Sequence, residues 1–182
     1  VGFESGNQNI LNKIKKGIKL DMAREFMANC NKLGIKVHGT FIIGLPLETK
    51  ETIEETIAFA KELDPHTIQV SIAAPYPGTE LYSQAVENGW FGKDALISGS
   101  GIQTASLRYD HLSSEEMEEA VARMYKEFYF RMKPILRIVK EMATDKQMLV
   151  RRLREGQEFF GYLNERKVAS QQHRARQASA SS

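Results

Sequence analysis

The sequence predicts an α/β fold with parallel strands in the first half of the chain and a helical second half. Apolar, β-branched runs at residues 35–43 and 67–74 alternate with segments of helical spacing. The connections between them are short, which is typical of parallel βαβ units. From residue 114 to 168 the spacing is helical, without a strand pattern. We therefore expect an α/β domain with a helical extension.

The first predicted strand is the opening stretch "VGFES", and a short helix or turn is expected within residues 7–18. Asp21 is a candidate N-cap for the next helix, which Gly34 ends after Leu33. The apolar positions of this helix follow helical spacing, and they are Met22, Phe26, Cys30 and Leu33.

A second helix is predicted between the runs 35–43 and 67–74, capped by Thr49 or Thr52. It extends to Leu63 and faces inward through Ile53, Ile57, Phe59 and Ala60. After the third strand, "PYPGT" turns the chain, and a helix from Thr79 to about Asn88 follows. Three parallel strands alone would leave both sheet edges bare, so we expect neighbouring strands or self-association through the edges.

The second half of the chain has no predicted strands. Residues 93–112 lack periodicity, and we expect an irregular linker there. The stretch "SSEE" has capping-box spacing and begins a helical extension, 113–168, with a break at Pro134. The tail, 169–182, is polar and low in complexity, which predicts disorder.

Composition and charge argue against several classes of protein. The 182 residues have a net charge of +2, which does not suggest a nucleic-acid binder. Cys30 is the single cysteine, so neither an internal disulfide nor a cysteine-bound metal site can form, and a reducing, cytoplasmic location is expected. No apolar run approaches the roughly 20 residues of a membrane span. Residues 123–167 contain 12 Lys/Arg and 6 Asp/Glu, whereas residues 1–122 contain 11 and 17, so a basic helical part follows an acidic one.

Candidate binding residues lie at the strand ends. In "GFESG", Glu4 and Ser5 follow the first strand, where a carboxylate can bind ribose hydroxyls or an ammonium group. In "GTFIIGLPLET", alternation sends Thr40 and Ile42 to one face of the strand. Gly44 would let a planar ring approach the backbone.

Two further features belong to these loops. Glu48 is a candidate cap for the helix that follows. In "APYPGT", Pro75 and Pro77 bracket Tyr76 and make a stiff loop that is suited to lining a pocket. Each motif alone is more often a well-made strand–helix connection than a binding site.

The order and spacing of the motifs resemble the second half of a radical S-adenosylmethionine (SAM) domain. The stretches that carry this resemblance are "GFESGNQNILNKIKKG", "KLGIKVHGTFIIGLPLETKETIEETIAFAKELDP" and "QVSIAAPYPGTELYSQAVENGW". They look most like the subgroup with a cobalamin-binding domain, and the last stretch resembles the hopanoid-biosynthesis-associated radical enzymes. The resemblance implies that residues 1–92 form the second half of a partial (βα)₆ barrel.

The resemblance also implies a set of cofactor-binding residues. Glu4, with Ser5 beside it, matches a position near the ribose or methionyl end of SAM. Lys16 matches a basic position for the methionyl carboxylate, and Thr40 a position that faces the ribose. The positions that pack near the adenine or the substrate are Ile42, Gly44, Pro75 and Tyr76. No catalytic side chain and no metal ligand is implied.

In this family a [4Fe–4S] cluster, held by a CxxxCxxC loop, reduces SAM to a 5′-deoxyadenosyl radical. The sequence contains no such loop. We therefore expect the C-terminal part of a longer radical SAM enzyme, inactive by itself, whose parent uses SAM, the cluster and cobalamin on a small-molecule, hopanoid or other lipid substrate. Nucleic acid is not an expected partner.

A second hypothesis is a non-catalytic α/β binding or scaffold module that uses the basic helices as its partner surface. A solvated face is the more common role of such helices. They would also suit peripheral contact with anionic lipid at the inner membrane. An ordinary (βα)₈ enzyme is less favoured, because phosphate-binding glycines are missing. The residues of the proposed lipid surface are Phe128, Phe130, Met132, Ile135, Leu136 and Ile138, beside Arg131, Lys133, Arg137 and Lys140.

Overall fold

The computed structural model describes residues 1–90 and 107–144, together with isolated helical residues between 154 and 168. It divides into two compact units, Val1–Tyr125 and Lys126–Ser182. Most of the predicted linker, the end of the helical extension and the predicted disordered tail lie outside the described residues. The predicted domain boundaries therefore stay predictions.

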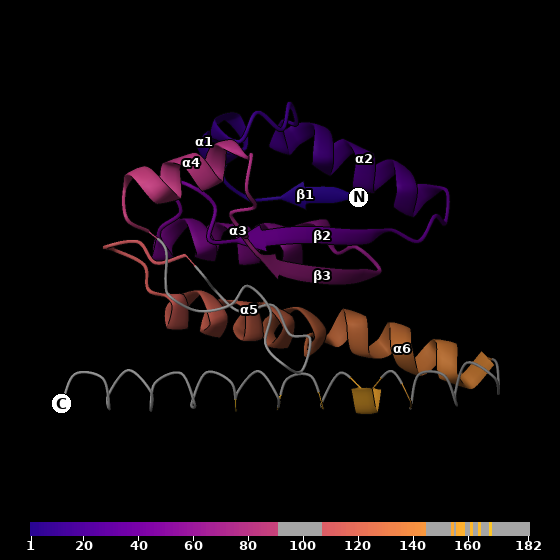
Figure 1. The fold of residues 1–182 in the computed structure, drawn as a ribbon. Coiled ribbons are helices and arrows are strands. Elements are labelled where there is room, and N and C mark those ends of the chain that lie inside the picture. Colours follow the sequence, from indigo (N-terminus) through magenta and orange to yellow (C-terminus); the bar gives the residue numbers. More distant parts are fainter. Residues whose placement is uncertain are drawn as a thin grey trace. The chain divides into compact units, whose positions relative to one another are not determined.

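A three-stranded parallel sheet lies at the centre of the first unit (Figure 1). Its strands are β1 (Gly2–Glu4), β2 (His38–Ile43) and β3 (Thr67–Ile72), in the order β1-β2-β3. β2 and β3 pair without interruption, from His38 opposite Thr67 to Ile43 opposite Ile72. The α/β class and the parallel strands predicted from the sequence are confirmed.

Helices follow each strand, as the sequence predicts. In chain order they are α1 (Gln8–Lys13), α2 (Leu20–Lys32), α3 (Lys50–Leu63), α4 (Glu80–Glu87), α5 (Ser114–Tyr129) and α6 (Met132–Thr144). Thr49 caps α3 and forms a reciprocal capping box with Thr52, and Thr79 caps α4. Ser113 and Glu116 form the predicted capping box of α5, with the Ser113 amide donating to the Glu116 carboxylate over 2.8 Å.

Two predicted caps are wrong. Lys19, not Asp21, occupies the N-cap of α2, and Asp21 lies in the first turn, where it pairs with Arg24 at 2.8 Å. An acid there still favours the helix through the dipole. Glu48 does not cap α3 either, because Thr49 takes that position and the Glu48 side chain turns back toward β2.

The helix break predicted at Pro134 occurs a few residues earlier in the chain. α5 ends at Tyr129 and α6 begins at Met132, so Pro134 lies in the first turn of α6. Proline is tolerated there because the first N–H groups of a helix have no acceptor within it.

The two faces of the sheet differ in polarity. One face is apolar and buried, and it presents Phe3, Phe41, Ile43, Ile68, Val70 and Ile72. The other face is half-buried to exposed and mostly polar, and it presents Gly2, Glu4, Thr40, Ile42, Gln69 and Ser71. Parallel sheets are usually covered on both faces. We call the second set the open face.

The two edges of the sheet also differ. On the outer side of β3, the Val70 amide donates to the Tyr125 hydroxyl of α5 over 2.9 Å. α5 thus supplies one acceptor to this edge, which no further strand of the described residues covers. Within the described residues, β1 pairs with β2 alone.

The buried face of α2 differs from its apolar spacing in the sequence. Ala23, Met27 and Cys30 are buried, whereas Met22 and Leu33 are exposed. Cys30 is thus part of the core, as expected. None of the described helices combines the length and the apolar character needed to cross a bilayer.

Candidate functional site

The carboxyl ends of the three strands meet at one edge of the sheet, and the candidate residues lie there. Because the strands are parallel, the loops after Glu4, Ile43 and Ile72 leave the sheet on the same side (Figure 1). This is the edge at which open α/β sheets bind ligands. The structure thus brings together loops that are far apart in the sequence.

Glu4 and Lys16 form an ion pair at the end of β1. The Lys16 ammonium lies 2.6 Å from Glu4 Oε1, and the two side chains are 33% and 15% exposed. Glu4 has a left-handed backbone with φ 64°, which is uncommon for a residue with a side chain. A Cβ added at Gly2 would lie 2.3 Å from Glu4 Oε1, so the pair occupies the space that this glycine leaves. The predicted cofactor residues Glu4 and Lys16 are therefore neighbours.

Ser5 holds the turn after β1 and is not exposed to a ligand. Its side chain is fully buried, accepts from the Asn7 amide over 3.1 Å, and lies 3.3 Å from the Thr56 hydroxyl. The Gly6 amide donates to the same Thr56 hydroxyl over 3.0 Å. These bonds fix the turn that follows Glu4.

Thr40 and Ile42 lie on the open face of β2, as alternation predicts. Both are half-buried, whereas Phe41 and Ile43 between and after them are fully buried. The Thr40 hydroxyl donates to the Val1 carbonyl over 3.4 Å, which is a long contact. Its hydroxyl therefore keeps capacity for a ligand.

The loop after β2 is buried and held by an internal carboxylate. Gly44 has φ 87°, and its amide donates to the Glu48 side chain, which is fully buried. Burial raises the pKa of Glu48 to about 7, against the opposing effect of the bonds from the Gly44 and Leu45 amides. Glu48 Oε1 has no hydrogen-bond partner among the described residues. This carboxylate shapes the loop that the sequence analysis assigned to the adenine.

A second segment, residues 107–112, packs on the same loop. The Tyr109 hydroxyl donates to the Gly44 carbonyl over 2.9 Å, and His111 Nε2 lies 2.9 Å from the Glu48 carbonyl. Burial, and then the charge of Glu48, raise the pKa of Tyr109, so its hydroxyl stays protonated and donates. Neither residue is predicted from the sequence, because "RYDHL" has no periodicity and Tyr109 lies 65 positions from Gly44.

The loop after β3 is more exposed. Pro75 is buried, but the side chain of Tyr76 is 55% exposed. A cavity of 290 Å³ lies at the same edge, between the end of α1, the β2–α3 loop and the start of α4. Its lining includes Lys13, Leu45 and Thr79.

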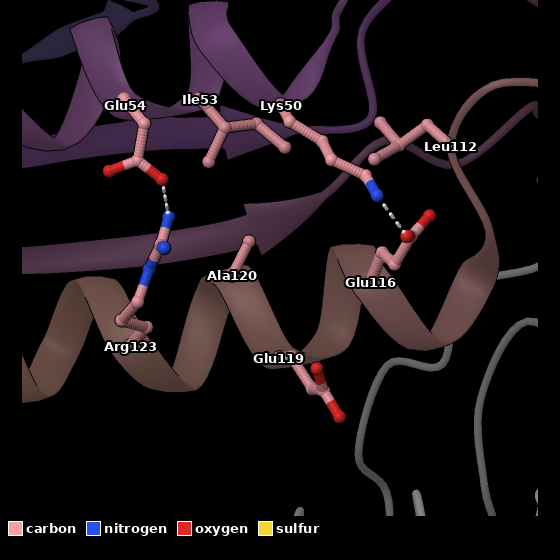
Figure 2. Close-up of a pocket in the computed structure, with 8 residues that line it drawn as sticks. All are labelled: Lys50, Ile53, Glu54, Leu112, Glu116, Glu119, Ala120 and Arg123. Atoms are coloured by element: carbon pink, nitrogen blue, oxygen red, sulfur yellow. Dashed lines mark hydrogen bonds and ion pairs between the residues drawn. The ribbon is translucent and has the colours of Figure 1, made fainter.

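A second cavity, of 270 Å³, lies between α3 and α5 and is shown in Figure 2. Lys50 and Glu116 pair across it at 2.6 Å, and Arg123 pairs with Glu54. Its charged groups thus join two helices, and this arrangement explains the cavity without a ligand.

The donor groups fit SAM but not an iron–sulfur cluster. A carboxylate, an ammonium and hydroxyls suit the ribose and the methionyl group. At Gly44, Met117 already occupies the side that lacks a Cβ. Over the described residues, no three His, Cys, Asp or Glu side chains are placed to hold a metal ion. The one cysteine, Cys30, is buried in α2, so no step is assigned to a cluster.

Comparison with known proteins identifies the first part of the chain. Residues 1–60, which include β1, β2 and most of α3, match the family model of the Radical SAM superfamily. The predicted family is thereby confirmed at this level, and a partial barrel is consistent with the three parallel strands.

Relatives of this chain have names that refer to methyl transfer. An uncharacterized methyltransferase of Pyrococcus horikoshii is 35% identical over 140 residues, 77% of this chain and 30% of the relative. The cytidylyl-2-hydroxyethylphosphonate methyltransferase of Streptomyces wedmorensis is 29% identical over 69% of this chain and 25% of the relative. The bacteriochlorophyllide d C-8(2)-methyltransferase of Chlorobaculum tepidum is 31% identical over 48% of this chain and 20% of the relative.

The chain spans a third or less of the length of these relatives. An alignment of 140 residues also extends beyond the 92 that the sequence analysis compared with the family. The similarity therefore includes part of the chain that follows the three strands.

Proposed function

We propose that this chain binds the adenosine half of SAM on the open face of its sheet and on the loops at the carboxyl edge. One observation carries the proposal: a parallel sheet in a radical SAM segment keeps a polar, half-buried face, with Thr40 on it and Gly44 at its end. A parallel sheet with no ligand to bind would be expected to bury an apolar face there.

Each residue has a distinct role in this proposal. Lys16 leaves its ion pair with Glu4 to bind the methionyl carboxylate, and Glu4 then accepts from a ribose hydroxyl or the methionyl ammonium. Thr40 donates to the ribose. The adenine ring approaches the backbone at Gly44 on the side away from Met117, whose sulfur would lie 2.7 Å from a Cβ added there. The left-handed backbone of Glu4 agrees with a functional position, since strained residues gather at such sites.

SAM supplies the reactive carbon–sulfur bond when it is bound, and the chain supplies position and a dry environment. The buried loop after β2 excludes water from the adenine side, because Leu45 and Pro46 are buried with Gly44. We propose that residues 1–182 alone do not cleave SAM, since one cysteine cannot hold the cluster.

Calorimetry with SAM and with 5′-methylthioadenosine tests the proposal. Thr40→Val should weaken both ligands about fivefold, because one hydrogen bond is worth roughly 1 kcal/mol. Lys16→Gln should weaken SAM but not 5′-methylthioadenosine, which lacks the carboxylate. Lys32→Gln is the matched control, since Lys32 is exposed in the last turn of α2, away from the carboxyl edge of the sheet. If neither ligand binds the unaltered protein, the proposal is wrong.

For the whole protein, we propose methyl transfer with cobalamin as a second cofactor. The names of the Pyrococcus, Streptomyces and Chlorobaculum relatives, which are all methyltransferases by name, support the transfer class. Cobalamin and a hopanoid or other lipid substrate are proposals from the sequence resemblance alone. Anaerobic turnover of the whole protein with methyl-labelled SAM would test them: label in a lipid extract supports the substrate, and label that persists without cobalamin contradicts the cofactor.

Peripheral membrane contact through α6 is a further proposal. Four apolar side chains with helical spacing are exposed on α6, namely Met132, Ile135, Leu136 and Val139. Lys133 and Arg137 lie on the same helix, which suits anionic headgroups. Phe128, included in the predicted lipid surface, is buried and lies under the Arg131 guanidinium, so it does not belong to that surface.

Co-sedimentation with vesicles tests α6. Vesicles that contain phosphatidylserine should carry down more protein than phosphatidylcholine vesicles, and salt should weaken this binding. Leu136→Asp should reduce it, while Met22→Asp, at an exposed apolar position of α2, should not. Equal binding to both vesicle types would exclude the electrostatic contribution and favour a non-catalytic partner surface of another kind.

A further inference from the structure

Gly44 is held by two side chains that come from different parts of the chain. Its amide donates to the buried carboxylate of Glu48, and its carbonyl accepts from the Tyr109 hydroxyl over 2.9 Å. Gly44 has a left-handed backbone with φ 87°, and glycine has more conformational freedom than any other residue type. With both of its polar groups bound, the orientation of the two peptide planes around Gly44 is fixed.

Tyr109 is itself held in one position. Its ring makes an edge contact with Trp90, with centroids 4.8 Å apart, and stacks on His111 at 5.7 Å. The side chain is only 5% exposed. The Arg108 amide also donates to the Trp90 carbonyl over 2.8 Å, which fixes the backbone before Tyr109. These contacts fix the ring of Tyr109, and they therefore fix the position of the hydroxyl that binds Gly44.

The rest of the segment binds the same loop and the helix behind it. His111 Nε2 lies 2.9 Å from the Glu48 carbonyl, and the Ser114 hydroxyl donates to the Leu107 carbonyl over 3.1 Å. Met117 of α5 fills the side of Gly44 that lacks a Cβ, since an added Cβ would lie 2.7 Å from its sulfur. Residues 107–117 thus contact the Gly44 loop through hydrogen bonds and packing at three points.

We propose that Tyr109 is a positioning residue for the adenine of SAM: its hydroxyl fixes the Gly44 carbonyl and, through it, the backbone that the ring approaches. This inference rests on the proposed function. It assigns a cofactor-related role to a residue outside the segment that matches the superfamily, residues 1–60. Tyr109 acts through Gly44 and is not expected to touch the ligand.

A purely structural role is the alternative, and the chain offers a matched control for it. Tyr125 is also buried, and its hydroxyl accepts from the Val70 amide in the middle of β3 over 2.9 Å. Tyr125→Phe removes one buried hydroxyl and one bond to strand backbone, as Tyr109→Phe does. It leaves the Gly44 loop unaltered.

The test compares the two variants in the full chain, with 5′-methylthioadenosine as the probe. This probe carries the adenosine half and does not need a cluster. Tyr109→Phe should raise its Kd about fivefold, the size expected from the loss of one hydrogen bond in the loop. Tyr125→Phe should leave the Kd unchanged. If the two variants bind alike, or if Tyr109→Phe binds as tightly as the unaltered chain, the inference is overturned.

Amide hydrogen exchange shows whether the lost bond acts locally on the Gly44 loop or on the stability of the whole domain. In Tyr109→Phe, exchange at Gly44 and Leu45 should accelerate more than in the middle of β3, whereas Tyr125→Phe should accelerate exchange at Val70. Uniform acceleration in Tyr109→Phe would overturn the inference.

The binding experiment distinguishes the failure of the inference from the failure of the proposed function. If the unaltered chain does not bind the probe, the proposed function fails and the inference fails with it. If the unaltered chain binds and Tyr109→Phe has no effect, only the inference is rejected.

Discussion

The loops after β2 and after β3 leave the same edge of the sheet but are held very differently. The first is buried at Gly44, Leu45 and Glu48, and Tyr109 binds it from a distant part of the chain. In the second, the side chain of Tyr76 is 55% exposed, and the bonds that the structure gives its turn are local.

The difference suggests different tasks for the two loops. A loop whose backbone is fixed before binding pays little ordering entropy, which suits a ligand common to a whole superfamily. A loop that is stiffened only by prolines and exposes an aromatic side chain suits a ligand that varies between relatives. The following predictions test this comparison, from the largest expected effect to the smallest.

The largest effect should come from the charge of Glu48. Its pKa of about 7 in the folded protein exceeds the value of 4.5 for an exposed carboxyl. The folded state therefore binds the proton more tightly, and this contribution to stability is lost as the pH rises from about 4.5 through 7. The shift corresponds to roughly 3 kcal/mol.

Glu48→Gln should remove this pH dependence while keeping an acceptor for the Gly44 amide. Urea unfolding at pH 4.5 and pH 8 should show the variant gaining roughly 3 kcal/mol relative to the unaltered protein over that range. The lowered pKa values of Glu62 and Glu116 act in the opposite direction, but they are common to both proteins and cancel. A constant difference between the two pH values would contradict the assignment.

Gly44→Ala and Gly78→Ala form a matched pair, because both glycines have φ 87°. An alanine at either site costs roughly 1 kcal/mol in backbone strain. At Gly44 the new Cβ would also displace Met117, whereas nothing lies within 4 Å at Gly78. We expect losses of roughly 2–3 kcal/mol and about 1 kcal/mol in the free energy of unfolding, respectively. Equal losses would show that the two loops are equally adaptable.

Leu47→Gly should stabilise the protein slightly. Leu47 has a left-handed backbone with φ 72° and is 60% exposed, so the glycine relieves strain without loss of core packing. The gain should be about 0.5 kcal/mol, since the added freedom of the unfolded chain offsets part of it. Leu33→Gly is the control, because Leu33 is exposed but has φ −88°. If both variants lose stability by thermal denaturation, Leu47 stores no strain.

Tyr76→Ser should have the smallest effect on stability. The side chain is more exposed than buried, and the bonds of the turn use the Tyr76 carbonyl, which accepts from the Thr79 amide and hydroxyl. We expect a change below about 0.5 kcal/mol. A loss above about 1 kcal/mol would mean that Tyr76 packs as part of the fold, and that the two loops resemble each other more than their burial suggests.

The sequence alone determined the order of strands and helices, because periodicity and capping are local properties. The alternation around Thr40 and Ile42 was sufficient to place both on the open face, and the threonine caps of α3 and α4 were readable from a few neighbouring residues. The motif order likewise indicated the superfamily that residues 1–60 match.

Only the tertiary structure decided which side chains share a site. The pairing of Glu4 with Lys16, the return of Glu48 to the Gly44 amide and the arrival of Tyr109 at the Gly44 carbonyl all depend on how separate segments pack. The sequence also does not distinguish the exposed apolar positions of α2 from the buried ones, since both sets have helical spacing. Local patterns specify hydrogen bonds within a few residues, whereas contacts across 65 positions are selected by burial in the folded core.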